Sequence, residues 1–410
     1  MRIGLVTTSF PRFEGDIAGA FVLGFARALV SRGHAVRVLA PEAEAGEAPS
    51  GFEGIEVRWV AYVRPRSWSR TFYGAGVPDN LRTDPRAWLG LGPFAVALFR
   101  CAGEALAGCD ALVSHWAVPC ALAAGAVRGG RPHLAVLHSA DVHALCKLPL
   151  GGVIARRVAR SATALLFVSE RQRDRFLALL PSLERARVAG QCHVSAMGID
   201  PLPEGRSRRE ARRALGLERF TVLSMGRLVP IKGIDCAIEA VSAARCALGP
   251  GPSAQSGDGD GVELVVAGDG PERDRLERHA AARGARVRFV GLVTGAAKAD
   301  LLRAADAFVL PSIETRAGRS EGLPTTLLEA MHASLPVVAT DTGGIDTVVT
   351  HDRSGLLVPP DRPDALRAAL ARLRDDRSLR RRLARAGHNT AKRYLWAELA
   401  PHLEALLTPG

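Results

Sequence analysis

Short apolar runs alternate with amphipathic helical stretches along most of this chain, and the alternation occurs in two successive series. Such a pattern is typical of parallel sheets built from β-α-β units. The first series predicts strands near residues 2–8, 35–40, 55–60, 110–114, 133–138 and 164–168, with helices near 17–32, 93–107, 118–128, 152–160 and 170–180. The second series predicts strands that start near Phe220 and continue at 262–267, 286–290, 306–310 and 336–340. The chain is therefore predicted to be an α/β protein with two parallel sheets.

A turn-rich stretch separates the two series. Met197-Gly-Ile-Asp-Pro201 is followed by Pro203-Glu-Gly205, and both segments are suited to a linker. The chain has 410 residues, of which 47% are hydrophobic, and this is enough for two domains with their own cores. The sequence thus predicts an N-terminal domain over 1–196 and a C-terminal domain over 197–392.

A candidate phosphate-binding loop follows the predicted strand that begins at Phe220. Gly226 allows close approach of the backbone, and Arg227 and Lys232 place two cations five residues apart, before a helix expected from about Ile234. Arginine can bridge two phosphate oxygens, lysine acts as a point charge, and a helix N-terminus favours anions. The segment is predicted to hold a diphosphate, and the alternative is a strand, loop and helix whose cations are merely solvated.

Two carboxylates, Glu321 and Glu329, are separated by seven residues. If the whole span were helical, they would lie on one face about 12 Å apart. That separation exceeds the roughly 5 to 9.5 Å of a glycoside hydrolase pair. Gly322 is predicted to lie in a loop and Pro324 in the first turn of a helix, whose free N–H groups should face what Glu321 faces. The pattern predicts a site for an extended ligand that carries both hydroxyls and an anion.

Together these segments resemble the retaining nucleotide-sugar glycosyltransferases of family 4 (group 1). These enzymes have the GT-B fold, in which two Rossmann-like domains with parallel sheets face each other across a cleft. The resemblance covers nearly the whole chain and is most specific in the second half. Its motifs are Gly-Arg-Leu-x3-Lys-Gly from Gly226, Leu264-Val-Val-Ala-Gly268-Asp-Gly270-Pro271, Val287-Arg-Phe-Val-Gly291 and Glu-x7-Glu from Glu321.

The resemblance implies a role for each donor-side residue. Arg227 and Lys232 are expected to hold the donor diphosphate, Glu329 to bind the ribose, and Glu321 with the following backbone to meet the transferred sugar. The implied donor-binding set is Gly226, Arg227, Lys232, Gly291, Glu321, Gly322, Leu323, Pro324, Thr325 and Glu329. The resemblance also implies that the last helix, within 393–410, packs on the first domain.

His138 stands where an apolar strand of the first half stops. From the residues alone, a hydrogen-bonded histidine at a strand end is the plainer interpretation. The resemblance matches His138 to a histidine that touches the transferred sugar, although this chain has His-Ser-Ala-Asp where relatives often have His-Gly-Ser-Asp. The implied catalytic set is His138, Arg227, Lys232 and Glu321. An acceptor-side loop is expected to contain Gly15, Asp16, Gly19 and Asp141, with helix capping as the alternative role of Asp16.

Several other kinds of site are disfavoured. No Gly-x-Gly-x-x-Gly follows the first predicted strand, which argues against a nicotinamide dehydrogenase. Asp258-Gly-Asp260 resembles a metal-binding pair, but it lies in a Gly/Ser-rich loop and is interpreted as solvated. A metal site at His138, Asp141 and His143 is also disfavoured. No metal and no cofactor is expected, and the nucleotide diphosphate-sugar is a co-substrate.

The net charge of +12 and a pI near 10.1 favour an anionic partner. No nucleic-acid-binding motif is found, which leaves sugar nucleotides, an anionic membrane surface or a compositional preference for arginine. Arginines and aromatics alternate in Arg64-Pro-Arg66-Ser-Trp68-Ser-Arg70-Thr-Phe72-Tyr73, and the apolar-rich segment 87–99 follows. This region is predicted either to bind a membrane interface or to be a packed helix with solvated arginines.

The expected localisation is cytoplasmic, with possible peripheral attachment to the inner face of the membrane. No signal peptide or apolar run of 18 or more residues is found, and the seven cysteines are odd in number with no Cys-x-x-Cys pair. The predicted function is retaining transfer of a hexosyl-type sugar to a glycan or lipid-linked saccharide, in polysaccharide or glycolipid synthesis. The alternatives are a small soluble acceptor, a non-catalytic sugar-nucleotide-binding protein and, more distantly, a nicotinamide oxidoreductase.

Overall fold

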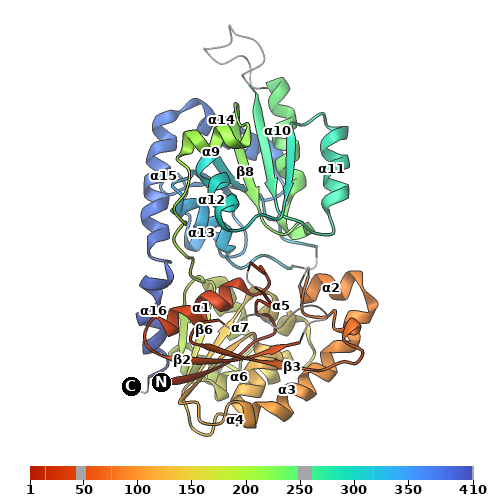
Figure 1. The fold of residues 1–410 in the computed structure, drawn as a ribbon, viewed down its shortest axis with the longest axis vertical. Coiled ribbons are helices and arrows are strands. Elements are labelled where there is room, and N and C mark those ends of the chain that lie inside the picture. The colour runs from red at the N-terminus through yellow and green to blue at the C-terminus, as the bar shows by residue number, and fades with distance from the viewer. Residues whose placement is uncertain (14, 43–51, 75, 248–260, 317, 409–410) are drawn as a thin grey trace. The chain divides into compact units, whose positions relative to one another are not determined.

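The computed structural model describes residues 1–13, 15–42, 52–74, 76–247, 261–316 and 318–408 (Figure 1). The chain forms two compact units. Unit 1 comprises Met1–Ile199 and Leu395–Gly410, and unit 2 comprises Asp200–Tyr394. The assignment of acceptor and donor binding to these two parts stays a prediction.

Unit 1 is built on a parallel sheet of seven strands in the order β3-β2-β1-β4-β5-β6-β7. The strands are β1 (Arg2–Val6), β2 (Ala35–Pro41), β3 (Ile55–Val60), β4 (Ala111–His115), β5 (His133–Leu137), β6 (Ala164–Phe167) and β7 (Cys192–Val194). The longer helices are α1 (Ala20–Val30), α2 (Val77–Thr83), α3 (Leu91–Ala105), α4 (Leu122–Val127), α5 (Ser139–Lys147), α6 (Gly151–Ser161), α7 (Glu170–Ala178), α8 (Ser182–Ala189) and α16 (Trp396–Ala405). Short helical turns are η1 (Arg66–Trp68), η2 (Pro85–Gly90) and the π-helical η3 (Ala117–Ala121).

Unit 2 has a parallel sheet of six strands in the order β10-β9-β8-β11-β12-β13. Its strands are β8 (Phe220–Met225), β9 (Val262–Ala267), β10 (Val287–Gly291), β11 (Ala307–Leu310), β12 (Val337–Thr340) and β13 (Leu356–Val358). Its helices are α9 (Arg208–Leu215), α10 (Ile234–Ala247), α11 (Arg273–Ala282), α12 (Gly295–Ala304), α13 (Thr325–His332), α14 (Pro363–Asp375) and α15 (Arg377–Lys392), with the short turns η4 (Pro230–Lys232) and η5 (Ile345–Thr347).

Both sheets reverse their strand order at an internal strand. In unit 1 the reversal lies between β1 and β4, and in unit 2 it lies between β8 and β11. In open α/β sheets, ligands bind outside the carboxyl ends of the strands at such a reversal. The topology therefore points to the segments after β8 and β11 in unit 2, and to those after β1 and β4 in unit 1.

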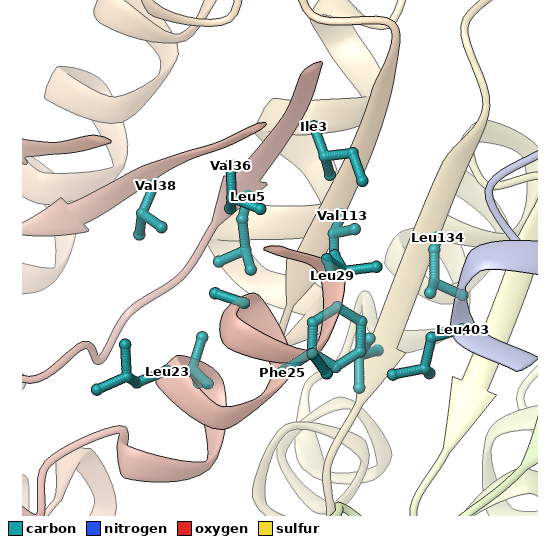
Figure 2. Close-up of a cluster of buried hydrophobic side chains, with 14 of the residues drawn as sticks. Ile3, Leu5, Leu23, Phe25, Leu29, Val36, Val38, Val113, Leu134 and Leu403 are labelled. Atoms are coloured by element: carbon teal, nitrogen blue, oxygen red, sulfur yellow. The ribbon is translucent and has the colours of Figure 1, made fainter. Parts of the chain in front are cut away.

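The core of unit 1 joins the two ends of the chain. Figure 2 shows Phe25 and Leu29 of α1 beside strand residues such as Val113, with Leu403 of α16 in the same cluster. Trp396 fills the space next to Gly24, where an added Cβ would lie 2.2 Å from the indole Nε1. Any side chain at Gly24 would therefore displace Trp396. The expected packing of the last helix on the first domain agrees with this arrangement.

The predicted α/β class with two parallel sheets is confirmed, and most predicted strands match within two residues. The predicted helix over 118–128 is instead divided into η3 and α4. The sequence analysis gave no bounds for helices α2, α5, α8, α11, α12, α14 and α15 or for the short strands β7 and β13. Among the described residues, no helix is long and apolar enough to cross a membrane.

Candidate functional site

The loop after β8 is held close to its neighbours by glycine. Gly268 has φ 142°, and a Cβ there would lie 1.9 Å from the carbonyl oxygen of Gly226. Gly226 itself has φ 150°, and an added Cβ would lie 3.2 Å from Cε of Lys232. Only glycine permits this backbone conformation together with such close packing. The loop thus brings Arg227 and Lys232 to the carboxyl end of β8, where both line a small hollow.

Lys232 is the best-defined cation of this loop. Its Nζ lies 2.6 Å from Oε1 of Glu321, and each of the two side chains is only 11% exposed. The other carboxylate oxygen of Glu321 accepts a hydrogen bond from Ser312 Oγ, just after β11. The structure therefore brings together Lys232 and Glu321, which the sequence placed on separate motifs. A partly buried ion pair of this kind keeps both charges in fixed positions.

Gly291 supports the same loop from the end of β10. Its carbonyl oxygen accepts a hydrogen bond of 2.7 Å from the N–H of Gly268, whose own position is set against Gly226. Arg227 is half-buried beside them. Gly291 thus acts through the backbone in this structure, and direct contact of Gly291 with a donor stays a prediction.

The segment between β11 and α13 turns at Glu321 and Gly322. A Cβ on Gly343, where φ is 65°, would lie 2.1 Å from the carbonyl oxygen of Glu321, and the N–H of Gly344 donates to the carbonyl of Gly322. The sequence placed Pro324 in the first helical turn, but it is the extended N-cap residue of α13. Proline fixes only φ, so it is compatible with either position.

The N-terminus of α13 has no acidic residue in its first turn and no side-chain cap. The first N–H groups of a helix lack partners within the helix, and they carry a partial positive charge. Half-buried Leu323 and Thr325 adjoin this end. The arrangement fits an anion near the two cations of the β8 loop.

Glu329 has a partner that the sequence analysis missed. Lys298 of α12 places its Nζ 3.0 Å from Glu329 Oε1, while Oε2 is buried without a hydrogen-bond partner among the described residues. Thr326 Oγ1 and Ser320 Oγ are buried and unpartnered in the same segment. Buried polar atoms usually have partners, so these atoms have hydrogen-bonding capacity that no described residue uses. Lys298 is one of only four lysines in the chain, and this rarity was the available signal.

In unit 1, His138 follows β5 and is the N-cap residue of α5. Its Nε2 lies 3.1 Å from Nδ1 of His115, the last residue of β4, and the two rings stack. Phe21 and Trp116 lie against the same imidazole. Burial lowers the pKa of His138 to about 3, so the ring is neutral near pH 7. His115 was not singled out from the sequence, because a histidine within a buried strand carries no pattern of its own.

Trp116 continues this cluster in a strained conformation. Its φ of 71° lies in the left-handed region, where a bulky aromatic residue is rare. The conformation turns the chain sharply after β4 and holds the indole beside His138, with ring centroids 4.9 Å apart. Strain retained at a strand end is characteristic of functional sites.

Asp141 lies in a helix rather than in a loop, and its contact with an acceptor stays a prediction. It lies in the first turn of α5, is buried, and accepts hydrogen bonds from the N–H groups of Ala117 and Val142. Burial raises the pKa of Asp141 to about 7, although those backbone hydrogen bonds act in the opposite direction. The carboxylate ties the chain after β4 to the start of α5, and thereby fixes the surroundings of His138.

Asp16 accepts hydrogen bonds from residues of its own loop. Its carboxylate lies 2.7 Å from Arg12 Nε and accepts the N–H groups of Arg12 and Ala18. Burial raises the pKa of Asp16, but the hydrogen bonds from Arg12 outweigh burial and leave the pKa below its usual value. The alternative role of capping α1 is wrong, because the N-cap residue is Gly19.

The two glycines of this loop differ in their surroundings. Gly15 is exposed with open space around it, whereas a Cβ at Gly19 would lie 2.4 Å from the carbonyl oxygen of Ser9. Gly19 therefore fixes where α1 starts, and Gly15 leaves the loop accessible. Contact of Gly15, Asp16 and Gly19 with an acceptor stays a prediction.

Only some side chains of the predicted cationic and aromatic cluster at 64–73 are exposed to solvent. Phe72 and Tyr73 are 4% and 7% exposed, and the Tyr73 hydroxyl donates to the carbonyl of Pro41. Arg64 and Arg66 both pair with Glu42. Phe72 and Tyr73 belong to the buried core beneath α3, whereas Trp68 is 45% exposed, so membrane attachment through this cluster stays a prediction.

A neighbouring surface is more strongly apolar. We call Trp88, Leu89, Val96 and Phe99 the α3 surface, and all four are large exposed residues of η2 and α3. Arg86 and Arg100 are exposed nearby in sequence, without side-chain partners among the described residues. Val96 and Arg100 are four residues apart and share one face of α3. The apolar segment predicted at 87–99 therefore has one buried and one exposed face.

The described residues contain no group of three or more His, Cys, Asp or Glu side chains that could hold a metal ion. Asp258-Gly-Asp260 lies outside the described residues. The six cysteines whose side chains are described are free.

Two protein-family models match the chain, one within each of its two units. Residues 207–390 match the family model of glycosyl transferases group 1, and residues 18–192 match that of a glycosyl transferase 4-like domain. The GDP-mannose-dependent alpha-(1-6)-phosphatidylinositol monomannoside mannosyltransferase of Mycobacterium tuberculosis is 29% identical over 99% of this chain and 98% of its own length. The phosphatidyl-myo-inositol mannosyltransferase of the same species is 28% identical over 98% and 95%, respectively.

Solved structures agree at the level of the fold. Sucrose-phosphate synthase from Thermosynechococcus elongatus is 20% identical and superposes with a TM-score of 0.74, over 99% of this chain and 98% of that one. The lipopolysaccharide biosynthesis glycosyltransferase WaaG is 17% identical, with a TM-score of 0.63 over the full length of both chains. The chain therefore belongs to the group 1 (family 4) glycosyltransferases and has the GT-B fold.

Proposed function

We propose that this enzyme transfers mannose from GDP-mannose to a hydroxyl of an inositol-containing glycolipid, with retention of the anomeric configuration. One observation supports a nucleotide-sugar donor. Lys232, Glu321 and the uncapped start of α13 are grouped at the carboxyl ends of β8 and β11. GDP-mannose and the inositol lipid are suggested by the names of the two mycobacterial relatives, which align over nearly the whole chain.

Positively charged groups would bind the diphosphate of the donor, and a carboxylate would bind its ribose. Arg227, Lys232 and the first N–H groups of α13 would contact the diphosphate, because each offers positive charge or free donors. Oε2 of Glu329 is buried and unpartnered, and as an acceptor it would take a hydrogen bond from a ribose hydroxyl. Lys298 holds the other oxygen and keeps the carboxylate in place.

The reaction would proceed on one face of the sugar. The bond between the anomeric carbon and the leaving phosphate oxygen breaks, and the acceptor oxygen forms its bond to the same carbon from the same side. The acceptor proton passes to the departing diphosphate. Negative charge grows on that diphosphate in the transition state, so Arg227 and Lys232 would stabilise the transition state more than the bound donor. Glu321 is held by Lys232 and Ser312, and it would orient the sugar rather than form a covalent intermediate.

The α3 surface supports a lipid acceptor. Exposed tryptophan and phenylalanine favour the interfacial region of a membrane, and exposed arginine is attracted to anionic headgroups. Trp88 is 60% exposed and Phe99 43% exposed, with Arg86 and Arg100 close by in sequence. We propose that unit 1 attaches reversibly to anionic membranes through this surface.

A donor and acceptor panel tests the proposal. Purified protein is incubated with GDP-, UDP- and ADP-sugars, in the presence of vesicles that contain phosphatidylinositol or its mannosides, and released nucleotide and labelled lipid are measured. The proposal expects release of GDP from GDP-mannose together with mannosylated lipid. Nucleotide release with a soluble saccharide but not with lipid would show that the proposed acceptor is wrong. Preference for a UDP-sugar would show that the proposed donor is wrong.

A further inference from the structure

His115 and His138 each use one ring nitrogen in the contact between them, and each has a second ring nitrogen without a described partner. His115 Nδ1 lies 3.1 Å from His138 Nε2, and the rings stack with centroids 5.4 Å apart and planes 18° apart. His115 Nε2 is buried and has no partner among the described residues. Nδ1 of His138 makes no hydrogen bond to any described residue. The pair therefore has one internal hydrogen bond, one buried orphan nitrogen on His115 and one nitrogen on His138 that no described residue uses.

Burial keeps both rings neutral at ordinary pH. It lowers the pKa of His138 to about 3, and burial, with a smaller effect from the neighbouring His138 ring, lowers the pKa of His115 well below its usual value. A neutral imidazole carries one N–H and one acceptor nitrogen. Only two arrangements of the two protons then satisfy the 3.1 Å hydrogen bond.

In the first arrangement, His115 donates from Nδ1 to Nε2 of His138, and the orphan nitrogen of His115 is an acceptor. In the second, His138 donates from Nε2, and His115 must carry its proton on the buried Nε2 without an acceptor. An orphaned buried N–H is rarer in proteins than an acceptor that lacks a donor. The first arrangement is favoured, and it places the proton of His138 on Nδ1.

We infer that His115 is a positioning residue, which fixes His138 in the tautomer that carries its proton on Nδ1. His138 then presents a hydrogen-bond donor to a bound ligand, instead of an acceptor. The identity of that ligand rests on the proposed function, whereas the tautomer of the pair does not.

The surroundings limit any other arrangement of the two rings. The rings of Phe25 and His115 form a T-shaped pair with centroids 5.1 Å apart, and the Phe21 ring centroid lies 5.2 Å from that of His138. Asp141 fixes the chain after β4 by accepting the N–H of Ala117 at 2.8 Å. Both imidazoles are therefore confined by packing and by the backbone, as a positioned catalytic group requires.

The tautomer can be read directly by nitrogen-15 NMR of the full chain labelled at histidine, with long-range proton–nitrogen correlations. His138→Gln identifies the signals of His138 by their loss. The inference expects a protonated Nδ1 and an acceptor Nε2 at His138 in the wild type. A His138 protonated on Nε2 in the wild type would overturn the inference, whatever the activity of the protein.

Two substitutions test the effect of His115 on the reaction. His115→Phe keeps an aromatic ring but removes the donor, so kcat should fall about 10²-fold, the size found for loss of one positioned donor, with little change in KM for the donor sugar. His115→Asn can replace the lost N–H with its amide and should recover at least part of that loss and keep the wild-type tautomer. His193→Phe, at another histidine that packs on His402, serves as the control and should change neither readout.

The outcomes separate the inference from the proposed function. Unchanged kcat in folded His115→Phe would overturn the positioning role. The expected tautomer in a protein that transfers no sugar would leave the His115–His138 pair supported and refute the proposed function alone.

Discussion

Lys232 shows how one side chain connects two motifs that lie far apart in the sequence. Its ammonium group contacts Glu321, and the Glu321 carboxylate is also held by Ser312. The pair is mostly buried, so loss of either partner leaves a poorly solvated charge. The charge of Lys232 is thus available to a ligand from a fixed position.

Substitution of either cation in the β8 loop should lower turnover. Arg227→Ala and Lys232→Ala are each expected to reduce kcat about 10²- to 10³-fold, the range for loss of one preorganised electrostatic contact. Lys392→Ala, at an exposed lysine of α15, is the matched control and should leave kcat unchanged. Steady-state kinetics check the prediction, and wild-type rates in either loop variant would refute the diphosphate-binding role.

At this scale the sequence was informative where residue type and local spacing determine the chemistry. Arg227 and Lys232 could be chosen because a strand, a glycine and a helix surround them. His115 could not, and Lys298 offered only the rarity of lysine as a signal, because their roles depend on which helices and strands become neighbours. Asp141 was misplaced for a related reason: the chain after His138 continues directly into α5, a weakly amphipathic helix.

At the scale of elements, the segment that leads into α13 depends on the turn after β12. Gly343 and Gly344 pack against the backbone of Glu321 and Gly322. The first turn of α13 is therefore placed by contacts from a different β-α unit, rather than by a capping side chain of its own. A substitution in this turn should alter donor binding more than it alters the packing of the hydrophobic core.

Two glycine substitutions separate these effects. Gly343 and Gly216 have φ of 65° and 61°, so the backbone strain of alanine at either should cost about 1 kcal/mol of folding stability, apart from any clash of the new Cβ. Only at Gly343 would the new Cβ meet backbone, 2.1 Å from the carbonyl oxygen of Glu321; at Gly216 nothing lies within 4 Å. Calorimetric titration with GDP should show weakening of about tenfold or more for Gly343→Ala. It should show none for Gly216→Ala, and equal affinities would mean that the turn does not shape the site.

Elements with strong periodicity were predicted well. The strands at 55–60 and 262–267 have the predicted bounds, because their apolar runs end at clear turns. The three-residue strands β7 and β13 are too short to produce a pattern. The helix expected over 118–128 is interrupted because Val118 adopts a non-helical conformation within η3.

At the scale of the whole molecule, a net charge of +12 suits anionic donors and anionic membranes. The α3 surface should give weak, salt-sensitive binding to anionic vesicles. Each cation near such a surface contributes about 1 kcal/mol, and salt screens this contribution. Sedimentation with anionic or neutral vesicles, at low and high salt, checks the prediction.

Paired variants locate the membrane contact. Val96→Asp with Phe99→Asp should abolish vesicle binding, because both side chains are exposed on α3. Leu183→Asp changes a 92% exposed leucine of α8 and should have no effect. Equal binding to neutral vesicles, or none to either kind, would favour a soluble acceptor.

We further expect sugar transfer without a divalent metal. Arg227, Lys232 and the start of α13 supply positive charge for the diphosphate, and Asp258-Gly-Asp260 belongs to a Gly/Ser-rich sequence of low complexity. EDTA, or replacement of both aspartates by asparagine, should leave the transfer rate unchanged. A reversible metal requirement that disappears with those aspartates would reverse this expectation.

The stereochemistry of a single transfer tests the central claim most directly. With an α-linked donor such as GDP-mannose, proton NMR of the first product formed should show an α-linkage, with one GDP released for each bond made. This result follows if the acceptor attacks from the face that the diphosphate leaves. A β-linked first product, or the absence of nucleotide release with every donor in the panel, would contradict the account.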